Sequence, residues 1–290
     1  MCIPVFFVEW RSAALHTSGK SAAAVEAAGI LWYYFGVSGL LPASNLKIHL
    51  ERRRIMKKLE NLTAFRVRTG GFIWDSLPHG GGMETSPGLP QKVCPDGRMA
   101  PFGGNTVVFP LPEPARQEIG LIQDRLYQTC APALAEPLAV SSFHITLHDL
   151  LSGAPDQALR RRIDSVRAPA LARVRRIAEA GGTVRLHSTA LFNMVNTSMV
   201  LGFAPVDEES CRRLMACYEQ LQEVVPLNYP LTPHVTVAYF RPGTISAEMV
   251  GALRGVVEET GCREGILVEL SMKTVEYQLF SDMNHYWREE

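Results

Sequence analysis

The chain has 290 residues, 47% of them hydrophobic, and its 29 basic residues balance 29 acidic ones. This length and composition suffice for a full hydrophobic core in one large or two small domains. A formal net charge of zero excludes a uniformly basic surface, so we expect no stable binding of long nucleic acids. The six cysteines show no motif spacing, which indicates free thiols in a reducing, cytoplasmic compartment.

The first 55 residues carry the weakest sequence signals for a folded structure. An apolar run over residues 27–43 is at the short limit of a membrane span, but an acidic residue at its edge and internal Pro and Gly argue against a span or a secretion signal. Residues 51–55 suit a purine-rich ribosome-binding sequence, and Met56-Lys57-Lys58-Leu59 is typical of a bacterial N-terminus. We interpret residues 1–55 as a doubtful extension from a misassigned start, and we expect no membrane association.

Residues 56–102 form a lead-in to the main domain. Residues 70–104 are rich in Gly and Pro, with Gly80-Gly81-Gly82 near the middle, and this composition predicts a long loop. We interpret the loop as a possible lid over the mouth of a groove. It lacks the Gly-x-x-x-x-Gly-Lys-Ser/Thr sequence of a phosphate-binding P-loop.

Residues 103–290 contain a strand–helix–strand unit twice. The opening strands are predicted over residues 105–111 and 197–203, and an amphipathic helix follows each. Asp207 suits the N-cap of the second helix. The apolar stripes of the two helices comprise Ile119, Ile122, Leu126 and Cys130 in the first, and Cys211, Leu214, Tyr218, Leu221 and Val225 in the second.

Each unit ends in a β-branched run that contains His-x-Thr, namely His144-Ile145-Thr146 and His234-Val235-Thr236. The interval from Asn105 to His144 is 39 positions and that from Asn196 to His234 is 38, which indicates an internal repeat. We predict two halves of about 103–190 and 191–290, related by a pseudo-twofold axis.

The repeated motif has a chemical interpretation. Alternate residues of a strand share a face, so His144 lies beside Thr146, and His234 beside Thr236. One neutral and one charged imidazole supply the base and the acid that phosphodiester cleavage requires. The Thr hydroxyls can donate hydrogen bonds to phosphate oxygens.

Two further residues are candidates for substrate contact. His148 follows Thr146 by two residues and shares its face if the strand is regular; otherwise it is a polar residue at the rim. Arg241 lies just past the second motif strand and can reach an anion, although a solvated arginine is the alternative. Tyr239 is expected on the opposite face.

The remaining patterns predict ordinary elements. An arginine-rich segment predicts one or two helices broken at Pro169, either with a solvated face or suited to a phosphate-rich partner. Ser246 and Gly261 delimit another helix, and residues 266–270 and 273–280 are predicted strands.

The paired motifs, their 90-residue interval and the Gly-Asn-Thr strand resemble the two-histidine (2H) phosphoesterase superfamily, over roughly residues 103–281. The stretch Cys94-Pro95-Asp96-Gly97-Arg98 followed by Gly103-Gly104-Asn105-Thr106 is similar to an uncharacterised branch of it. The resemblance implies a bilobal α+β fold with a central groove between antiparallel sheets, and cleavage of a phosphodiester without metal or cofactor. It also implies that His144 and His234 are catalytic and that Thr146 and Thr236 hold phosphate oxygens.

Three functions remain open at this point. The first is a phosphodiesterase acting on a cyclic phosphate, a short oligonucleotide or an RNA end. The second is a binding protein that uses the same groove without catalysis. The third is a metallohydrolase with His144, His148 and His234 around zinc, although the sequence has no further metal-ligand motif.

Overall fold

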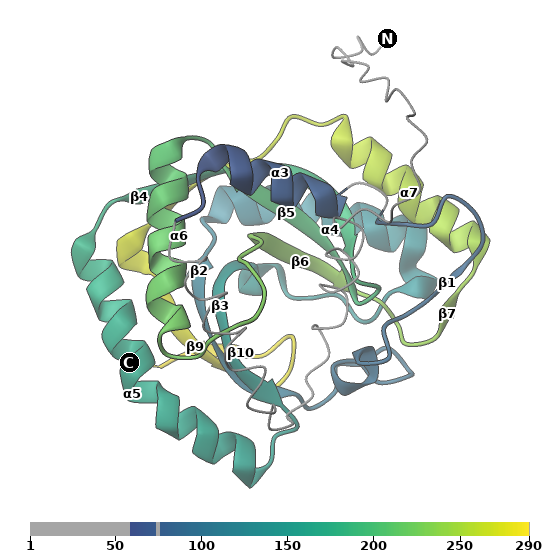
Figure 1. The fold of residues 1–290 in the computed structure, drawn as a ribbon. Coiled ribbons are helices and arrows are strands. Elements are labelled where there is room, and N and C mark those ends of the chain that lie inside the picture. The colour runs from purple at the N-terminus through teal and green to yellow at the C-terminus, as the bar shows by residue number, and fades with distance from the viewer. Residues whose placement is uncertain (1–58, 74–75, 290) are drawn as a thin grey trace, which may run out of the picture. The chain divides into compact units, whose positions relative to one another are not determined.

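The computed structural model describes residues 59–73 and 76–289 (Figure 1). The interpretation of residues 1–55 as a misassigned extension therefore lies outside the described residues. The helices are α3 (Leu62–Ile73), α4 (Glu113–Cys130), α5 (Gln157–Ala180), α6 (Glu208–Gln222) and α7 (Ala247–Gly261). The strands are β1 (Met83–Glu84), β2 (Gly103–Pro110), β3 (His144–Gly153), β4 (Thr183–Met194), β5 (Ser198–Pro205), β6 (His234–Tyr239), β7 (Thr244–Ile245), β8 (Leu267–Ser271), β9 (Glu276–Phe280) and β10 (Tyr286–Arg288).

Two antiparallel four-stranded sheets form the framework, with strand orders β10-β9-β2-β3 and β8-β4-β5-β6. The order makes β2 equivalent to β5 and β3 equivalent to β6. The two motif strands are the edge strands of their sheets, and they are in contact with each other. The predicted α+β class with antiparallel sheets is confirmed.

The division of the chain between the sheets differs from the predicted halves. The predicted boundary near residue 190 falls inside β4, which belongs wholly to the second sheet. The first sheet is completed by β9 and β10 from the end of the chain. The predicted equivalence between the opening strands of the two units is also wrong by one residue. Thr106 pairs with Asp149, and Ser198 pairs with Tyr239, so Asn105 corresponds to Thr197 and not to Asn196.

The first helix of each unit packs against the motif strand of the other unit: α4 contacts β6, and α6 contacts β3. The predicted apolar stripes are buried in both helices. Asp207 caps α6, because its carboxylate accepts a hydrogen bond from the Ser210 N–H at 2.7 Å. Ser246 caps α7 in the same way, so both predicted caps are confirmed.

The arginine-rich segment forms one continuous helix, not a broken pair. Pro169 lies inside α5, and Asp156 caps the helix through the Leu159 N–H at 2.7 Å. The helix runs along the outside of the first sheet (Figure 1), where it contacts β2, β3 and β9. Its apolar side, which includes Leu159, Ala170, Val174 and Ile177, is buried and holds it in place.

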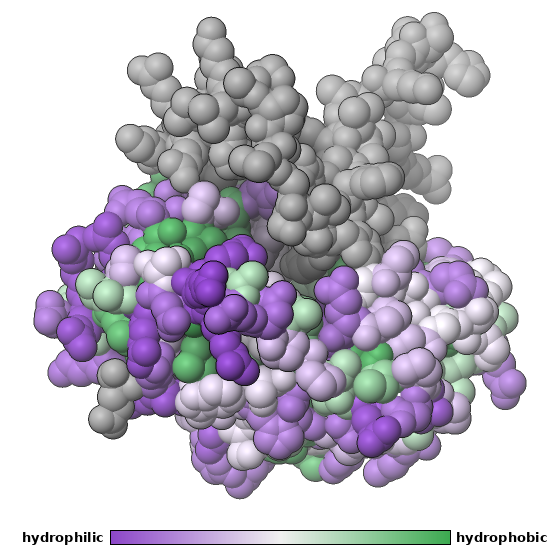
Figure 2. Space-filling view, turned by 90° about the horizontal axis from the view of Figure 1, so that it is seen from below, coloured by the Kyte–Doolittle hydropathy of each residue, from purple (hydrophilic) through white to green (hydrophobic). Residues whose placement is uncertain are grey.

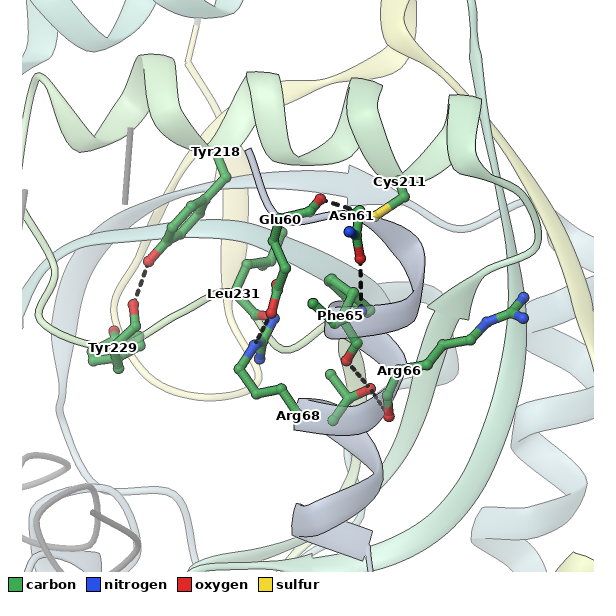
Figure 3. A network of polar contacts seen from close by, with 11 residues as sticks. Glu60, Asn61, Phe65, Arg66, Arg68, Cys211, Tyr218, Tyr229 and Leu231 are labelled. Carbon is green, nitrogen blue, oxygen red and sulfur yellow. Dashed lines mark hydrogen bonds and ion pairs between the residues drawn. The ribbon is translucent and has the colours of Figure 1, made fainter. Parts of the chain in front are cut away.

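The lead-in is more ordered than its composition predicts. The helix α3 continues to Ile73 and packs on α6, β4 and β5. Figure 3 shows the polar contacts that fix it: the Arg68 guanidinium pairs with Glu60, and the Asn61 side chain accepts a hydrogen bond from the Ala64 N–H. The strand β1 then pairs with β7, and a 3-10 helix follows at Leu89–Gln91, so residues 76–104 are not one long loop.

One main hydrophobic core joins the helices to both sheets. The face in Figure 2 is mostly hydrophilic, with hydrophobic residues in small separate patches. Among the described residues, no helix is long and apolar enough to span a membrane.

Candidate active site

Both predicted His-x-Thr motifs open an edge strand. His144 and His234 are the first residues of β3 and β6, and each motif side chain is half-buried. The registers match as well: Thr146 pairs with Val108 on β2, and Thr236 pairs with the equivalent Val200 on β5. The four predicted residues therefore occupy equivalent places on two strands in contact.

The two imidazoles are held in the same way. The Nδ1 atom of His144 lies 2.8 Å from the Ser142 carbonyl oxygen, and that of His234 lies 2.7 Å from the Thr232 carbonyl oxygen. A carbonyl only accepts, so Nδ1 must carry the proton and donate it. Each neutral ring therefore leaves Nε2 unprotonated and available to bind or accept a proton.

Burial lowers the pKa of both histidines, because it disfavours the charged form. The hydrogen bonds to Ser142 and Thr232 oppose this effect. The neighbouring charges differ between the two rings. A charge on His234 lowers the pKa of His144, whereas Asp149 and Glu276 raise it. Asp149 also raises the pKa of His234, and the Lys92 ammonium lowers it. The two rings thus interact electrostatically, and different charged groups surround each of them.

A β-bulge follows the motif in each strand. Between β2 and β3 the pairing passes from Val108–Thr146 to Val107–His148, so Leu147 has no partner. Between β5 and β6 the same step leaves Val237 without a partner. A bulge reverses the alternation of faces beyond it. The faces predicted for residues 148 and 239 are therefore exchanged.

His148 does not share the face of Thr146, which corrects the prediction for this residue. It pairs with Val107, a core residue, and is only 1% exposed. Its ring lies 5.2 Å from the ring of Tyr218 on α6, centroid to centroid. Neither ring nitrogen makes a hydrogen bond of acceptable geometry, and burial lowers the pKa of His148 to about 4. The structure places this imidazole in the core as a neutral group.

Asp149 takes the place predicted for His148. It pairs with Thr106, two residues from Val108 on β2, and so returns to the face of Thr146. Its exposed carboxylate accepts a hydrogen bond from the Tyr229 hydroxyl at 3.0 Å. The Tyr218 hydroxyl donates to the Tyr229 carbonyl (Figure 3), which fixes that loop to α6.

The equivalent residue in the second unit, Tyr239, also turns to the motif face and not away from it. Its hydroxyl donates to the Met283 Sδ atom at 3.1 Å, and the Lys92 ammonium lies 5.9 Å from the centre of its ring. Tyr286 packs edge-on against His144 with ring centres 4.9 Å apart. Lys92, Asp149 and Tyr286 therefore surround the motifs.

Arg241 lies beyond the other end of β6. A Cβ atom at Gly97 would be 3.1 Å from its Nε atom, so the guanidinium lies over the loop that contains Gly97. Its predicted role in substrate contact stays a prediction. No group of three or more His, Cys, Asp or Glu side chains in the described part of the chain is arranged to hold a metal ion.

Sequence reasoning missed Lys92, Asp149 and Tyr286 for different reasons. A bulge at Leu147 leaves no sign in the alternation of apolar residues, so regular alternation places His148, and not Asp149, on the face of Thr146. Lys92 and Tyr286 come from segments outside the repeat, and no spacing connects either of them with the histidines.

Of three similar solved structures, one supports the fold with a TM-score above 0.5. The conserved protein of unknown function ATU0111 from Agrobacterium tumefaciens matches with a TM-score of 0.55 and 19% identity, over 71% of this chain and 93% of that one. E. coli LigT in complex with 3′-AMP matches with a TM-score of 0.37 and 16% identity, over 65% and 96%. TT0787 of Thermus thermophilus matches with a TM-score of 0.41 and 17% identity, over 64% and 94%. The chain matches no protein-family model and no curated protein.

Proposed function

We propose that this chain, whose paired His-x-Thr motifs resemble those of the 2H phosphoesterases, is a phosphodiesterase that needs no metal and uses His144 and His234 as acid and base. The observation that carries the proposal is the matched geometry of the two motifs. Both imidazoles have Nδ1 bound to the carbonyl two residues earlier, and both have a Thr two residues later. Packing alone gives no reason for this equivalence on two strands. The substrate class is a cyclic phosphate, a short oligonucleotide or an RNA end.

The roles follow from proton transfer. One Nε2 atom takes the proton of the attacking water, and the other imidazole protonates the oxygen that leaves. Thr146 and Thr236 donate hydrogen bonds to the non-bridging oxygens, and the Lys92 ammonium adds positive charge next to His234.

The charges around the rings favour one assignment. Asp149 favours the protonated form of both rings and so does not distinguish them, whereas Glu276 favours the protonated form of His144 alone. His234 lies near the Lys92 ammonium, which stabilises its neutral form. We therefore assign His144 as the acid and His234 as the base in hydrolysis.

The test is turnover of 2′,3′-cyclic mononucleotides, cyclic dinucleotides and 2′-5′ and 3′-5′ oligonucleotides by the full chain in excess chelator. His144→Ala and His234→Ala should each lower kcat about 10²–10⁴-fold. The loss of kcat in the double variant should be far smaller than the product of the two single losses, because the two residues act as a unit. Thr146→Ala and Thr236→Ala should have smaller effects. His187→Ala, at an exposed position on β4, is the control.

Three outcomes would reject the mechanism. Full activity in either motif-histidine variant removes that residue from catalysis. Loss of turnover with chelator and its return with zinc would show a metallohydrolase. Tight binding of a nucleotide by the wild-type protein, with no turnover of any compound, would show a binding protein.

A further inference from the structure

Five of the seven arginines of α5 have no partner, unlike nearly all other arginines of the described residues. Outside α5, each described arginine except Arg241 forms an ion pair or donates to a backbone carbonyl. On α5, Arg167 pairs with Glu289 and Arg173 with Glu223. The five others make no ion pair or side-chain hydrogen bond, and all are exposed: Arg160, Arg161, Arg162, Arg175 and Arg176.

The zero net charge of the whole chain hides a strong local excess of positive charge on α5. Residues 157–180 contain seven arginines against Asp164 and Glu179, a formal charge of +5. Because the whole chain sums to zero, the rest carries −5. The helix after the second motif strand shows that the fold does not require a basic helix here. That helix, α7, has three Glu and one Arg, a formal charge of −2.

The five arginines form two groups on the solvent side of the helix. At 1.5 Å per residue, Arg161 and Arg175 are about 21 Å apart along the axis. The opposite side is anchored by Ala170, Val174 and Ile177, so the helix presents the charges rigidly. Arg176 also lines an open hollow of about 390 Å³ between α5 and the end of α6.

We propose that this face of α5, the α5 arginine face, binds the phosphate backbone of RNA. Unpaired guanidiniums are suited to phosphate, which accepts two of their N–H groups at once. An anionic membrane fits less well. The residues exposed between the arginines include Ala168, Ala172 and Ser165, and a membrane-surface helix needs large apolar side chains there.

The α5 arginine face is distinct from the candidate active site. α5 begins four residues after the end of β3, and His144 lies nine residues back along that strand. The separation along the strand is at most about 30 Å. A mononucleotide bound at His144 therefore cannot also contact the α5 arginine face.

Binding of a fluorescein-labelled 20-nucleotide RNA, followed by anisotropy between 50 and 200 mM salt, tests the proposal. Five phosphate contacts predict a slope of log K against log salt near −3.5, or about a 10²-fold loss over this range. Arg160→Gln/Arg161→Gln/Arg162→Gln should reduce the slope by about 2. The control is Arg98→Gln/Arg212→Gln/Arg263→Gln, which removes equal charge from paired arginines. It should bind RNA as the wild type does.

Equal weakening in the two triple variants would show general charge attraction and overturn the proposal. So would the absence of RNA binding at 50 mM salt, or binding only to vesicles with 30% phosphatidylserine. The α5 variant should hydrolyse a cyclic mononucleotide at the wild-type rate, so a failure of the proposed catalysis remains distinguishable from a failure of RNA binding.

Discussion

Replacing His148 by Phe should stabilise the protein, and the gain should grow as the pH falls. The imidazole is 1% exposed, and neither of its nitrogens makes a hydrogen bond of acceptable geometry. A phenyl ring fills a similar volume against Tyr218 without burying unpaired polar atoms. At pH 7, we expect the free energy of unfolding to rise by about 1–3 kcal/mol.

The pH-dependent part follows from the pKa of about 4 in the folded state against an ordinary 6.5. The unfolded state binds the proton more tightly, so this residue lowers stability as the pH falls from 6.5 to 4. Linkage gives a loss of about 0.2 kcal/mol at pH 7 and about 2 kcal/mol at pH 5. The advantage of the Phe variant should therefore be about 2 kcal/mol larger at pH 5 than at pH 7.

Urea unfolding of the full chain at the two pH values measures this difference, provided that the m-values agree. His187→Phe, the same exchange at an exposed position, is the control. An equal advantage at pH 5 and pH 7 would refute the argument from burial. Turnover should stay within a few-fold of the wild type; a loss above tenfold would return His148 to the active site.

Four other predictions use different parts of the structure. The kcat/KM profile, which reports the free enzyme, should be bell-shaped and centred below pH 6.5, because burial lowers the pKa of both motif histidines. Asp149→Asn should move both limbs to still lower pH, since the carboxylate raises both pKa values; a move to higher pH contradicts this. Gly104→Ala should destabilise by about 1–3 kcal/mol, because a Cβ atom would lie 2.3 Å from the Phe280 ring, whereas Gly251→Ala in α7 meets nothing within 4 Å and should stabilise by about 1 kcal/mol in urea unfolding. Ser246→Ala should cost about 1 kcal/mol by loss of the cap and Ser246→Asp should not; equal thermal stability of the two variants would contradict this.

The elements with strong local signals could be predicted from the sequence. Asp207 and Ser246 are capping residues with a regular apolar stripe after them, and both helices begin there. Pro169 misled the prediction of a broken helix, since burial of Val174 and Ile177 on one side keeps α5 continuous across it. The strand β4 was not predicted, although residues 183–188 alternate between exposed and buried positions.

The candidate site was predictable to the extent that it is repeated. His144, Thr146, His234 and Thr236 were found because the chain contains their pattern twice. The neighbours of the motifs depend on long-range pairing and on the two bulges. One extra residue in a strand changes the face of every side chain after it. No local property of Leu147 or Val237 predicts that a bulge forms there.

The arrangement of the strands also has a consequence for how the chain folds. β2 lies between β3 and β9, and the Val107–Tyr277 pair joins residues 170 positions apart. During synthesis, β2 and β3 leave the ribosome long before β9 is made. One edge of β2 therefore remains unpaired during this time. Such distant pairing is slow, because a large loop must close before the contacts form. We therefore expect the sheet with His144 to be completed last, and stalled chains that end before residue 276 to expose an unpaired strand edge that invites aggregation.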